Sequence, residues 1–409
     1  MQKTKRSLAL YSLFALLLLV LLACNGFRIF VSSFHHPFLP SPSETFLLSK
    51  SSSSMHMYSL KEDIPTTSKS KTHIDFVPSI RPHWNSSSKP PKNNKWVFKL
   101  LRPNERSRRF SERAQEFFNG SSPKCQVRFF MTWISPLESF GEREFFTVES
   151  LFKSHPKACL FIVSDSLDSP AGARLLAPLV SLGFRVSAVS PDFAYLFKST
   201  VAEAWFDRLR QGKVDPGEVS LAQNLSNLLR LAILYKFGGA YIDSDVIVMK
   251  SFSKLRNTIG AQTMDTQTGN WSRLNNAVMI FDKKHPLLYK FIEEFAHTFD
   301  GNKWGHNGPY LVSRVVERVS GRPGFDFTVL PPPAFYPVDW TRISGLFEGP
   351  GESSHSRWVE AKIEKIRKES FAVHLWNRQS RNIVVEEGSV IARMMSECCI
   401  FCNSSMSAL

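Results

Sequence analysis

The sequence predicts an α/β fold in which parallel strands form a sheet that is covered by helices on both faces. Short apolar runs at 125–135, 157–165 and 184–191 alternate with helical patterns at 143–156 and 173–183. Strands that alternate with helices in this way form parallel sheets. Such sheets bind their ligands beyond the carboxyl ends of the strands. Polar residues that follow these strands are therefore the first candidates for a functional site.

The amino-terminal part of the 409-residue chain is expected to lie outside this fold. Residues 1–7 are basic and residues 8–30 largely apolar, which is typical of a cytoplasmic tail and a single transmembrane anchor. A cleaved signal peptide, a bacterial lipobox at Cys24 and a buried core helix are the alternatives. The length of the run and the following Arg28 favour an uncleaved type II anchor. Residues 31–122 are then predicted to form a flexible stem.

The positive charge of the chain is concentrated in that stem. The formal net charge is +15, and 43% of the residues are hydrophobic. Much of the excess lies between residues 50 and 124, in a stretch rich in Ser, Pro and Asn. A nucleic-acid site is one interpretation. A solvated spacer is favoured, because aromatic residues are not regularly interleaved with the charges. We therefore expect no nucleic-acid partner.

Sequons and cysteines fit translocation into a secretory lumen. The N-x-Ser/Thr triplets begin at Asn85, Asn119, Asn224, Asn270 and Asn403. The cysteines after the expected anchor are Cys125, Cys159, Cys398, Cys399 and Cys402, an odd number, so at least one stays unpaired or pairs between chains. The CxxC at 399–402 has no second ligand pair nearby, which favours a disulfide or a plain tail over zinc.

A helix, a glycine turn and two acids form one unit between residues 220 and 250. The apolar stripe of 225–232 predicts the helix, and Gln223, Asn227 and Arg230 share another of its faces. Gly238 and Gly239 are expected to end it. An apolar strand then leads to Asp243 and Asp245, and two residues that are two apart in an extended chain point to the same side.

Two carboxylates at a strand end suit a hard divalent cation. Mg²⁺ and Mn²⁺ prefer oxygen ligands and often bridge protein carboxylates to phosphate oxygens. A solvated turn, or a pair of acids that caps the next element, is the structural alternative. A phosphatase of the haloacid-dehalogenase type also uses two such acids, but on its first strand, whereas several strands are expected before Asp243 here. The preceding helix with its arginine favours the metal site.

The same stretch resembles a known family. "LSNLLRLAILYKFGGAYIDSDVIVMKSF" resembles the DxD sugar-transferase region of family 32 glycosyltransferases. "NNAVMIFDKKHPLLYKFIEEFAHTFDGNKWGHNGPYLVSRVV", "AFYPVDW" and "FAVHLWN" resemble the α-1,4-glycosyltransferase domain of lactosylceramide galactosyltransferase and α-1,4-N-acetylglucosaminyltransferase relatives, including plant members. "FFMTWISPLESFGEREFFTVESLFKSHPKACLFIVSD" also resembles the plant members. The pieces stand in family order and cover most of the chain from residue 125 to residue 377.

The resemblance implies a fold, a reaction and a location. The fold is a GT-A-like Rossmann-type sheet with flanking helices. Residues 123–262 would bind the nucleotide sugar, 263–395 would form the α-1,4-glycosyltransferase region, and 396–409 would be a cysteine-containing tail. The activity is that of a retaining hexosyltransferase that moves a sugar from a UDP-sugar, galactose or N-acetylglucosamine, to a glycan or glycolipid with Mn²⁺ or Mg²⁺. The location is the Golgi membrane, with the catalytic part in the lumen.

The resemblance also implies roles for the residues of the DxD unit. Asp245 would bind the metal directly, Asp243 the metal or the ribose, and Arg230 the donor sugar or its phosphate; these three are the first catalytic candidates. Tyr241 is assigned to the same donor site. The chain departs from many relatives at Asn227, where they carry Asp. An amide can also donate to and accept from sugar hydroxyls, so a donor-binding role for Asn227 is retained, and an inactive sugar-binding relative is the alternative function.

Further candidates lie in the carboxyl-terminal half. The loop "KWGHNGPY" supplies Trp304 and Gly305 to bind the donor and Asn307 as a catalytic candidate, since a Trp can stack on a sugar face while amides bind its hydroxyls. Asn276 is expected to line the donor pocket. His374 would complete the metal site with Asp243 and Asp245.

No protein base or nucleophile is evident in the sequence. Retaining transfer can proceed by front-face substitution, in which a leaving phosphate oxygen takes the proton, or through a covalent glycosyl-enzyme. The first route is favoured, because Glu293, Glu294 and Asp300 have a spacing that suggests solvent exposure for at least some of them.

Overall fold

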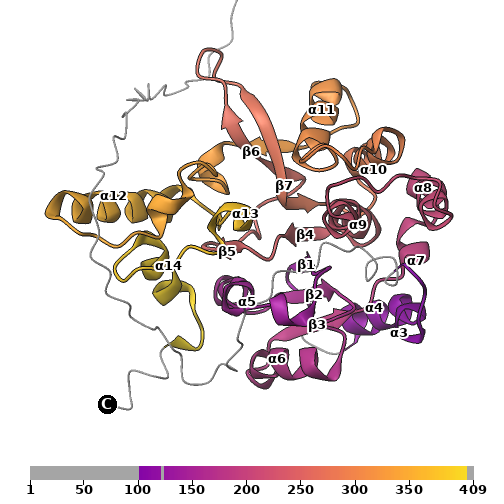
Figure 1. Ribbon diagram of the computed structural model, residues 1–409, viewed down its shortest axis with the longest axis horizontal. Helices are drawn as coiled ribbons and strands as arrows, with labels where there is room; N and C mark the ends of the chain where they lie inside the picture. Colours follow the sequence, from indigo (N-terminus) through magenta and orange to yellow (C-terminus); the bar gives the residue numbers. More distant parts are fainter. Residues whose placement is uncertain (1–100, 121–123, 403–409) are drawn as a thin grey trace, which may run out of the picture. The chain divides into compact units, whose positions relative to one another are not determined.

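The centre of the structure is a seven-stranded sheet whose first half is parallel, as predicted (Figure 1). The structure is a computed structural model and describes residues 101–120 and 124–402. The strands of this sheet are β3 (Arg185–Val189), β2 (Cys159–Val163), β1 (Arg128–Thr132), β4 (Gly239–Ile242), β7 (Trp271–Phe281), β6 (Thr258–Met264) and β8 (Thr328–Leu330), in this spatial order. Pairs β2–β3, β1–β2 and β1–β4 are parallel.

The second half of the sheet is mixed, which corrects the prediction of a parallel sheet. Strand β7 is antiparallel to β4 and to β6, and β8 is parallel to β6. Strands β6 and β7 are joined by only six residues, 265–270. So short a connection can join antiparallel strands but cannot make the crossover that a parallel pair requires.

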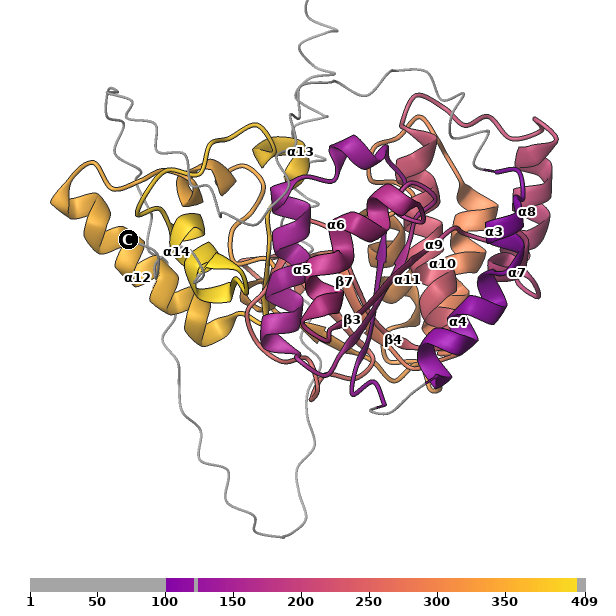
Figure 2. The ribbon, with the colours of Figure 1, turned by 90° about the horizontal axis from the view of Figure 1, so that it is seen from below.

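Period-two alternation distributes the strand side chains between two cores. In β1, Phe129 and Met131 face one core and Phe130 faces the other. The first core also takes residues of α5 (Glu142–Ser154), α6 (Pro170–Ser181), α12 (Ser353–Glu369) and α14 (Val390–Cys398). The second core takes residues of α7 (Phe193–Phe197), α8 (Val201–Arg210), α9 (Leu221–Phe237), α10 (Pro286–Thr298) and α11 (Pro309–Val319). Figure 2 shows α5 and α9 on opposite sides of the sheet.

Part of the predicted stem is folded. Residues within 31–122 form α3 (Glu105–Arg108) and α4 (Phe110–Asn119), and Phe110 and Ala114 are fully buried in the second core. Phe110, Ala114, Phe117 and Phe118 recur at helical spacing, but the many charges around them hid this pattern. No helix within residues 101–120 and 124–402 is long and apolar enough to cross a membrane. The expected anchor, residues 8–30, lies outside the described residues.

A small second sheet brings the end of the chain to the DxD unit. Strand β5 (Val246–Val248) pairs antiparallel with β9 (Ala372–His374), and Val246 lies opposite His374. The short helix α13 (Asn377–Ser380) follows directly. Residues that are more than a hundred positions apart in sequence thereby meet at one end of the main sheet.

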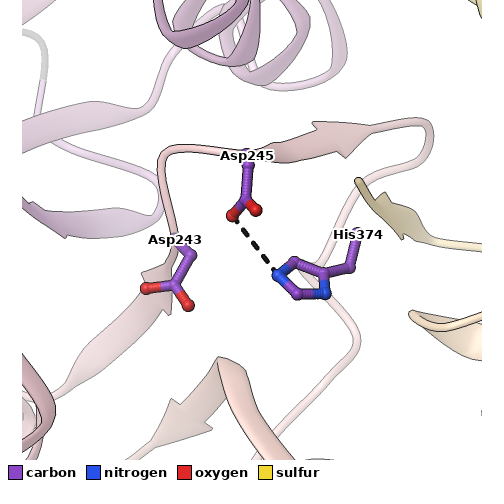
Figure 3. A group of neighbouring side chains, drawn as sticks. All are labelled: Asp243, Asp245 and His374. Carbon is purple, nitrogen blue, oxygen red and sulfur yellow. Dashed lines mark ion pairs between the residues drawn. The ribbon is translucent and has the colours of Figure 1, made fainter. Parts of the chain in front are cut away.

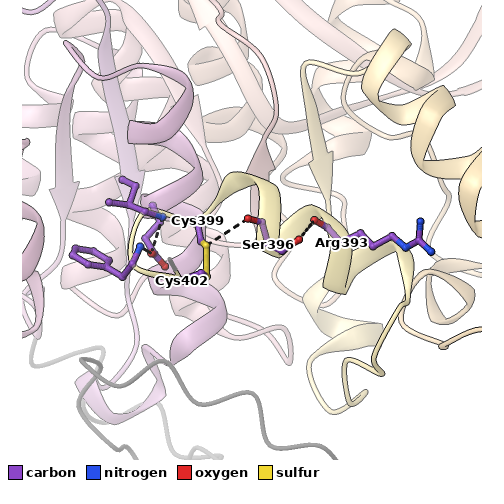
Figure 4. Close-up of a disulfide and its surroundings, with 7 residues drawn as sticks. Arg393, Ser396, Cys399 and Cys402 are labelled. Carbon is purple, nitrogen blue, oxygen red and sulfur yellow. Dashed lines mark hydrogen bonds between the residues drawn. A yellow bond between two sulfur atoms is a disulfide. The ribbon is translucent and has the colours of Figure 1, made fainter. Parts of the chain in front are cut away.

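Disulfides account for four of the five cysteines after the expected anchor. Cys125 is bonded to Cys159 at the start of β2, and Cys399 to Cys402 after α14 (Figure 4). Cys398 is buried and free, so the expected odd cysteine is found. The backbone N–H groups of Ile400 and Phe401 donate to the carboxylate of Glu149 on α5 at 3.2 and 3.1 Å. This buried acceptor fixes the tail to the domain.

Candidate metal and sugar-nucleotide site

Two glycines allow α9 to turn directly into β4. Gly238 and Gly239 have φ values of 64° and 129°, which favour glycine over any other residue. A Cβ on Gly238 would meet the backbone nitrogen of Lys283 at 2.5 Å, and one on Gly239 the carbonyl oxygen of Arg128 at 2.4 Å. The tight turn places the polar face of α9 beside the residues that follow β4.

Asp243, Asp245 and His374 come together at the end of β4 (Figure 3). Each offers one ligand atom, and these atoms all lie within 4.8 Å of one another. The two aspartates converge through a turn at Ser244 and Asp245, after which β5 begins. The expected reason, an extended chain, was therefore wrong although the convergence itself is found. Carboxylate oxygens and an imidazole nitrogen are suitable ligands for Mn²⁺ and related divalent cations.

Asp243 is held by Arg230 and Tyr241. The Arg230 guanidinium donates through Nη1 to Oδ2 at 3.1 Å and lies with Nη2 3.0 Å from Oδ1. The Tyr241 hydroxyl donates to Oδ1 at 2.8 Å. Burial raises the pKa of Asp243, and the positive charge of Arg230 opposes this effect. A cation that binds Asp243 would compete with a proton for the same carboxylate.

Arg230 directs most of its donors at the protein. It is 2% exposed. Besides Asp243, its Nη1 donates to the Asn276 carbonyl at 2.8 Å, its Nη2 to the Ser226 hydroxyl at 3.1 Å and its Nε to the Ser226 carbonyl at 3.3 Å. These contacts indicate a positioning role of Arg230 toward Asp243. The predicted contact of Arg230 with the sugar or phosphate stays a prediction.

Asp245 lies between His374 and the start of α13. Its Oδ1 is 3.3 Å from His374 Nε2, and its Oδ2 accepts from the Asn377 backbone N–H at 2.8 Å. Burial disfavours the Asp245 carboxylate, but the adjacent His374 and the hydrogen bonds outweigh it and lower the pKa. Burial alone would lower the pKa of His374. The negative charge of Asp245 and its hydrogen bond outweigh burial, so the pKa is raised. Trp376, with a left-handed φ of 54°, packs its ring 4.3 Å from that of His374.

Amide side chains line the cavity beside these ligands. The cavity has a volume of about 630 Å³, within the range of small-molecule sites. The Asn276 Nδ2 donates to the Asn227 Oδ1 at 3.0 Å, and the Asn275 Nδ2 to the Gln262 Oε1 at 3.0 Å. Gln223, Asn227 and Arg230 all contribute to the lining, as their shared helix face predicts. The amides supply both donors and acceptors of the kind that sugar hydroxyls require.

The loop before α11 contributes an exposed ring and an unexpected structural residue. Trp304 lines the cavity, and the Arg378 guanidinium lies 3.9 Å from its ring centre. Gly305, at a φ of 74°, leaves room for the Tyr310 ring, which a Cβ would meet at 2.8 Å. Asn307 is buried but does not line the cavity. Its side chain bonds to Asn224 and to the backbone of Asp300, so it shapes the loop instead of reaching a ligand.

Two polar residues behind the ligands, Glu144 and Thr132, were missed by the sequence analysis. Glu144 is buried, its pKa is raised by burial, and it accepts from the Asn377 side chain at 3.2 Å. Thr132 bridges the hydroxyls of Ser226 and Tyr241 at 2.6 and 2.8 Å. The position of Thr132 at the end of β1 was a usable signal. Glu144 gave none, because it occupies the third position of α5, where an acid caps the helix.

Family models match both halves of the chain. The model for the glycosyltransferase sugar-binding region containing the DXD motif matches residues 141–265, and that for the α-1,4-glycosyltransferase conserved region matches residues 280–406. Mouse lactosylceramide 4-alpha-galactosyltransferase is 30% identical over 62% of this chain and 68% of its own length. The chain belongs to the α-1,4-glycosyltransferase family. The predicted family and enzyme class, a hexosyltransferase, are thereby confirmed.

Other relatives are less similar in sequence than the mouse enzyme, or are longer than this chain. Human alpha-1,4-N-acetylglucosaminyltransferase is 25% identical over 60% of the chain and 68% of its own length. An uncharacterized Arabidopsis thaliana protein is 33% identical over 73% of the chain, which spans only 45% of that protein. Among solved structures, an active-site mutant of LgtC covers 66% of this chain and 95% of its own, with 12% identity and a TM-score of 0.38.

Proposed function

We propose that this family member is a retaining glycosyltransferase of GT-A type that transfers galactose or N-acetylglucosamine from a UDP-sugar to a glycan or glycolipid. The observation that carries the proposal is the convergence of Asp243, Asp245 and His374 at one end of a cavity lined by amides. Mn²⁺ is the favoured ion and Mg²⁺ the second candidate. When bound by these three residues, the ion supplies positive charge that stabilises a leaving diphosphate.

The residues of the chain then position the donor. Arg230 and Tyr241 fix the Asp243 carboxylate, and the Asn377 N–H fixes that of Asp245. Asn227 and Asn276 form hydrogen bonds with sugar hydroxyls. Asp245 and His374 are buried, which strengthens the electrostatic contact between them.

Front-face substitution is the proposed route. The bond from the acceptor oxygen to the anomeric carbon forms as the bond to the phosphate oxygen breaks, and that oxygen takes the acceptor proton. Among the described residues that line the cavity, only Asp243 and Asp245 carry a carboxylate. Glu293, Glu294 and Asp300 do not line it and are paired with basic residues. This supports a route without a protein nucleophile.

A Golgi location with an uncleaved type II anchor completes the proposal. The anchor would hold the enzyme at the membrane through residues 8–30 and present the site to the lumen. The disulfide between Cys125 and Cys159 supports an oxidising compartment.

An inactive sugar-binding relative is the second candidate function, and Asn227 is the observation that favours it. The amide occupies the place where many relatives carry Asp, and it already accepts a hydrogen bond from Asn276. Binding without turnover would be the outcome if the reaction needs the negative charge.

The test is UDP release by the purified full-length chain from a panel of UDP-sugars, with Mn²⁺ and with a chelator. Asp245→Asn is the variant, and Asp265→Asn, at an exposed hairpin, is the matched control. We expect release that requires Mn²⁺ and Asp245 and is unchanged in the control. Metal-dependent binding without release, with every acceptor tested, would favour the inactive relative. Neither binding nor release by folded protein would overturn the metal–diphosphate proposal.

A further inference from the structure

Three aromatic side chains stand exposed at the cavity. Trp304, Tyr310 and Trp340 are 51%, 43% and 45% exposed, and all three line the cavity. Within residues 101–120 and 124–402, no other Trp, Tyr or Phe is exposed to this degree. We call these three residues the aromatic rim. Exposed apolar surface gathered in one place marks a binding surface, whereas single exposed residues are ordinary.

The rim differs in exposure from the residues that would hold the donor phosphates. Asp245 and His374 are buried and the Asp243 side chain is 25% exposed, whereas the rim is open to solvent. The rim is therefore the part of the cavity lining that a second substrate can contact from solvent. Aromatic rings suit saccharides in particular, because the C–H groups on one face of a pyranose pack against the ring while its hydroxyls stay hydrated.

Arg273 adds a positive charge to this surface. Its guanidinium lies 4.5 Å from the centre of the Tyr310 ring, and it lines the cavity from β7. Gly305 leaves room for the Tyr310 ring, because a Cβ at this position would lie 2.8 Å from it. In the described part of the chain no carboxylate pairs with Arg273. A half-buried guanidinium without a counter-ion is a site for one.

The other two arginines of the cavity have different assignments. Arg230 is neutralised by Asp243. Arg378 is one position after Asn377, whose N–H binds Asp245, and its guanidinium lies 3.9 Å from the centre of the Trp304 ring. Arg273, on β7 beside Tyr310, is the half-buried arginine of the rim and is assigned to the second substrate. A guanidinium matches the two oxygens of a planar carboxylate in a bidentate contact.

We propose that the aromatic rim and Arg273 form the acceptor subsite, and that the acceptor is a saccharide bearing a hexuronate. Trp340 and Tyr310 pack against sugar faces, and Arg273 binds the carboxylate. The inference rests on the proposed function and adds the chemical class of the acceptor to it.

Binding of the acceptor can be measured without turnover. Oligosaccharides of galacturonate and of glucuronate, each with its carboxyl-reduced counterpart, would be titrated calorimetrically into the full-length chain saturated with UDP and Mn²⁺. We expect at least one acidic oligosaccharide to bind about tenfold more tightly than its reduced form. Arg273→Gln should remove this preference, and Trp340→Ala should weaken both forms about tenfold, which is typical of a lost ring contact. Arg322→Gln, at an exposed site, is the control.

Release of UDP from the UDP-sugar without acceptor separates this inference from the proposed function. The native chain should release UDP in this assay, and the Arg322→Gln control should release it at the same rate. Equal binding of the acidic and reduced forms, or binding of neither, would overturn the hexuronate proposal while leaving the transferase intact. A loss of UDP release in the Trp340→Ala chain would show instead that the rim serves the donor. Absence of UDP binding by the native chain would be a failure of the proposed function.

Discussion

Two pairs of acids follow buried strands of the same sheet, and among the described residues only one pair meets a third side chain that could bind a metal ion. Asp165 and Asp168 follow β2, as Asp243 and Asp245 follow β4. Asp168 binds Arg113 through both oxygens at 2.7 and 2.9 Å and also accepts from the Ser190 N–H and hydroxyl. These bonds keep its pKa low in spite of burial. In sequence the pairs look alike, and the difference lies in how many acceptor positions the protein itself has filled.

The largest expected effect is the loss of metal binding in Asp245→Asn. The change removes a ligand and one of the two negative charges, so we expect Mn²⁺ affinity to fall at least about 100-fold. Electron paramagnetic resonance of free Mn²⁺ measures the affinity. Asp168→Asn is the matched comparison and should bind Mn²⁺ as the native chain does. Equal loss in both variants would mean that the two pairs do not differ in the way described.

For the free energy of unfolding, we expect the larger loss on substitution of Asp168 and the smaller loss on substitution of Asp245. Asp168→Ala leaves the Arg113 guanidinium without its partner, and breaking such a pair typically costs about 3 kcal/mol of unfolding free energy. Asp245→Asn should cost much less, because it lowers the charge repulsion with Asp243. Urea unfolding of the two variants provides the measurement. A more stable Asp168→Ala chain would show that its ion pair does not stabilise the fold.

His155 makes the free energy of unfolding depend on pH. Its Nε2 accepts from the Phe252 N–H at 2.8 Å, which only the unprotonated ring can do, and burial lowers its pKa to about 4. The unfolded chain takes up this proton near pH 6.5, so stability falls as the pH decreases from about 6.5 to 4, by about 2 kcal/mol. Unfolding followed across this range should lose this component in His155→Leu and keep it in His297→Gln. An unchanged slope in His155→Leu would contradict the assignment.

The smallest expected effect concerns Asn227→Asp. A carboxylate can accept the Asn276 bond as the amide does, but Asn227 is 5% exposed, so the added charge should lower the free energy of unfolding by about 1 kcal/mol. We expect turnover to change by less than about tenfold, with a shift in preference between UDP-sugars. Steady-state kinetics with UDP-galactose and UDP-N-acetylglucosamine measure both. A gain of several hundredfold would identify the native chain as the inactive relative.

Local pattern predicted much of the fold, because it depends on residues near one another in sequence. Strands β1 to β4, the helices α5, α6 and α9 between them, and the glycine turn before Asp243 follow from apolar periodicity and turn chemistry, whereas α7 and α8 were not predicted. The mixed pairing in the second half of the sheet does not follow from local pattern, because it depends on the position of β7 between β4 and β6. Helix α4 was hidden by charge, as Phe110 and its neighbours stand among arginines and glutamates.

The sequence predicted which residues lie at the site better than it predicted the role of each residue. Asp243, Asp245 and His374 are brought together, and Asn227, Asn276, Trp304 and Gly305 line the same cavity. Arg230 and Asn307 turned out to serve other residues, since periodicity gives the face of a helix but not the partners of a side chain. Trp340 ends the "AFYPVDW" motif and Arg273 lies on β7, far from it in sequence, so only the three-dimensional arrangement could group them.

The pairing of β5 with β9 also has a kinetic consequence. Asp245 and Asn377 are separated by 132 positions along the chain, yet a single hydrogen bond joins them. Contacts of such sequence separation form late, because a long loop must close before they contribute. The two aspartates follow β4, whereas the imidazole belongs to β9 near the end of the chain, so the three side chains are together only while β9 is paired with β5. Because a bound ion stabilises only the folded form, it would act chiefly by slowing the release of this segment.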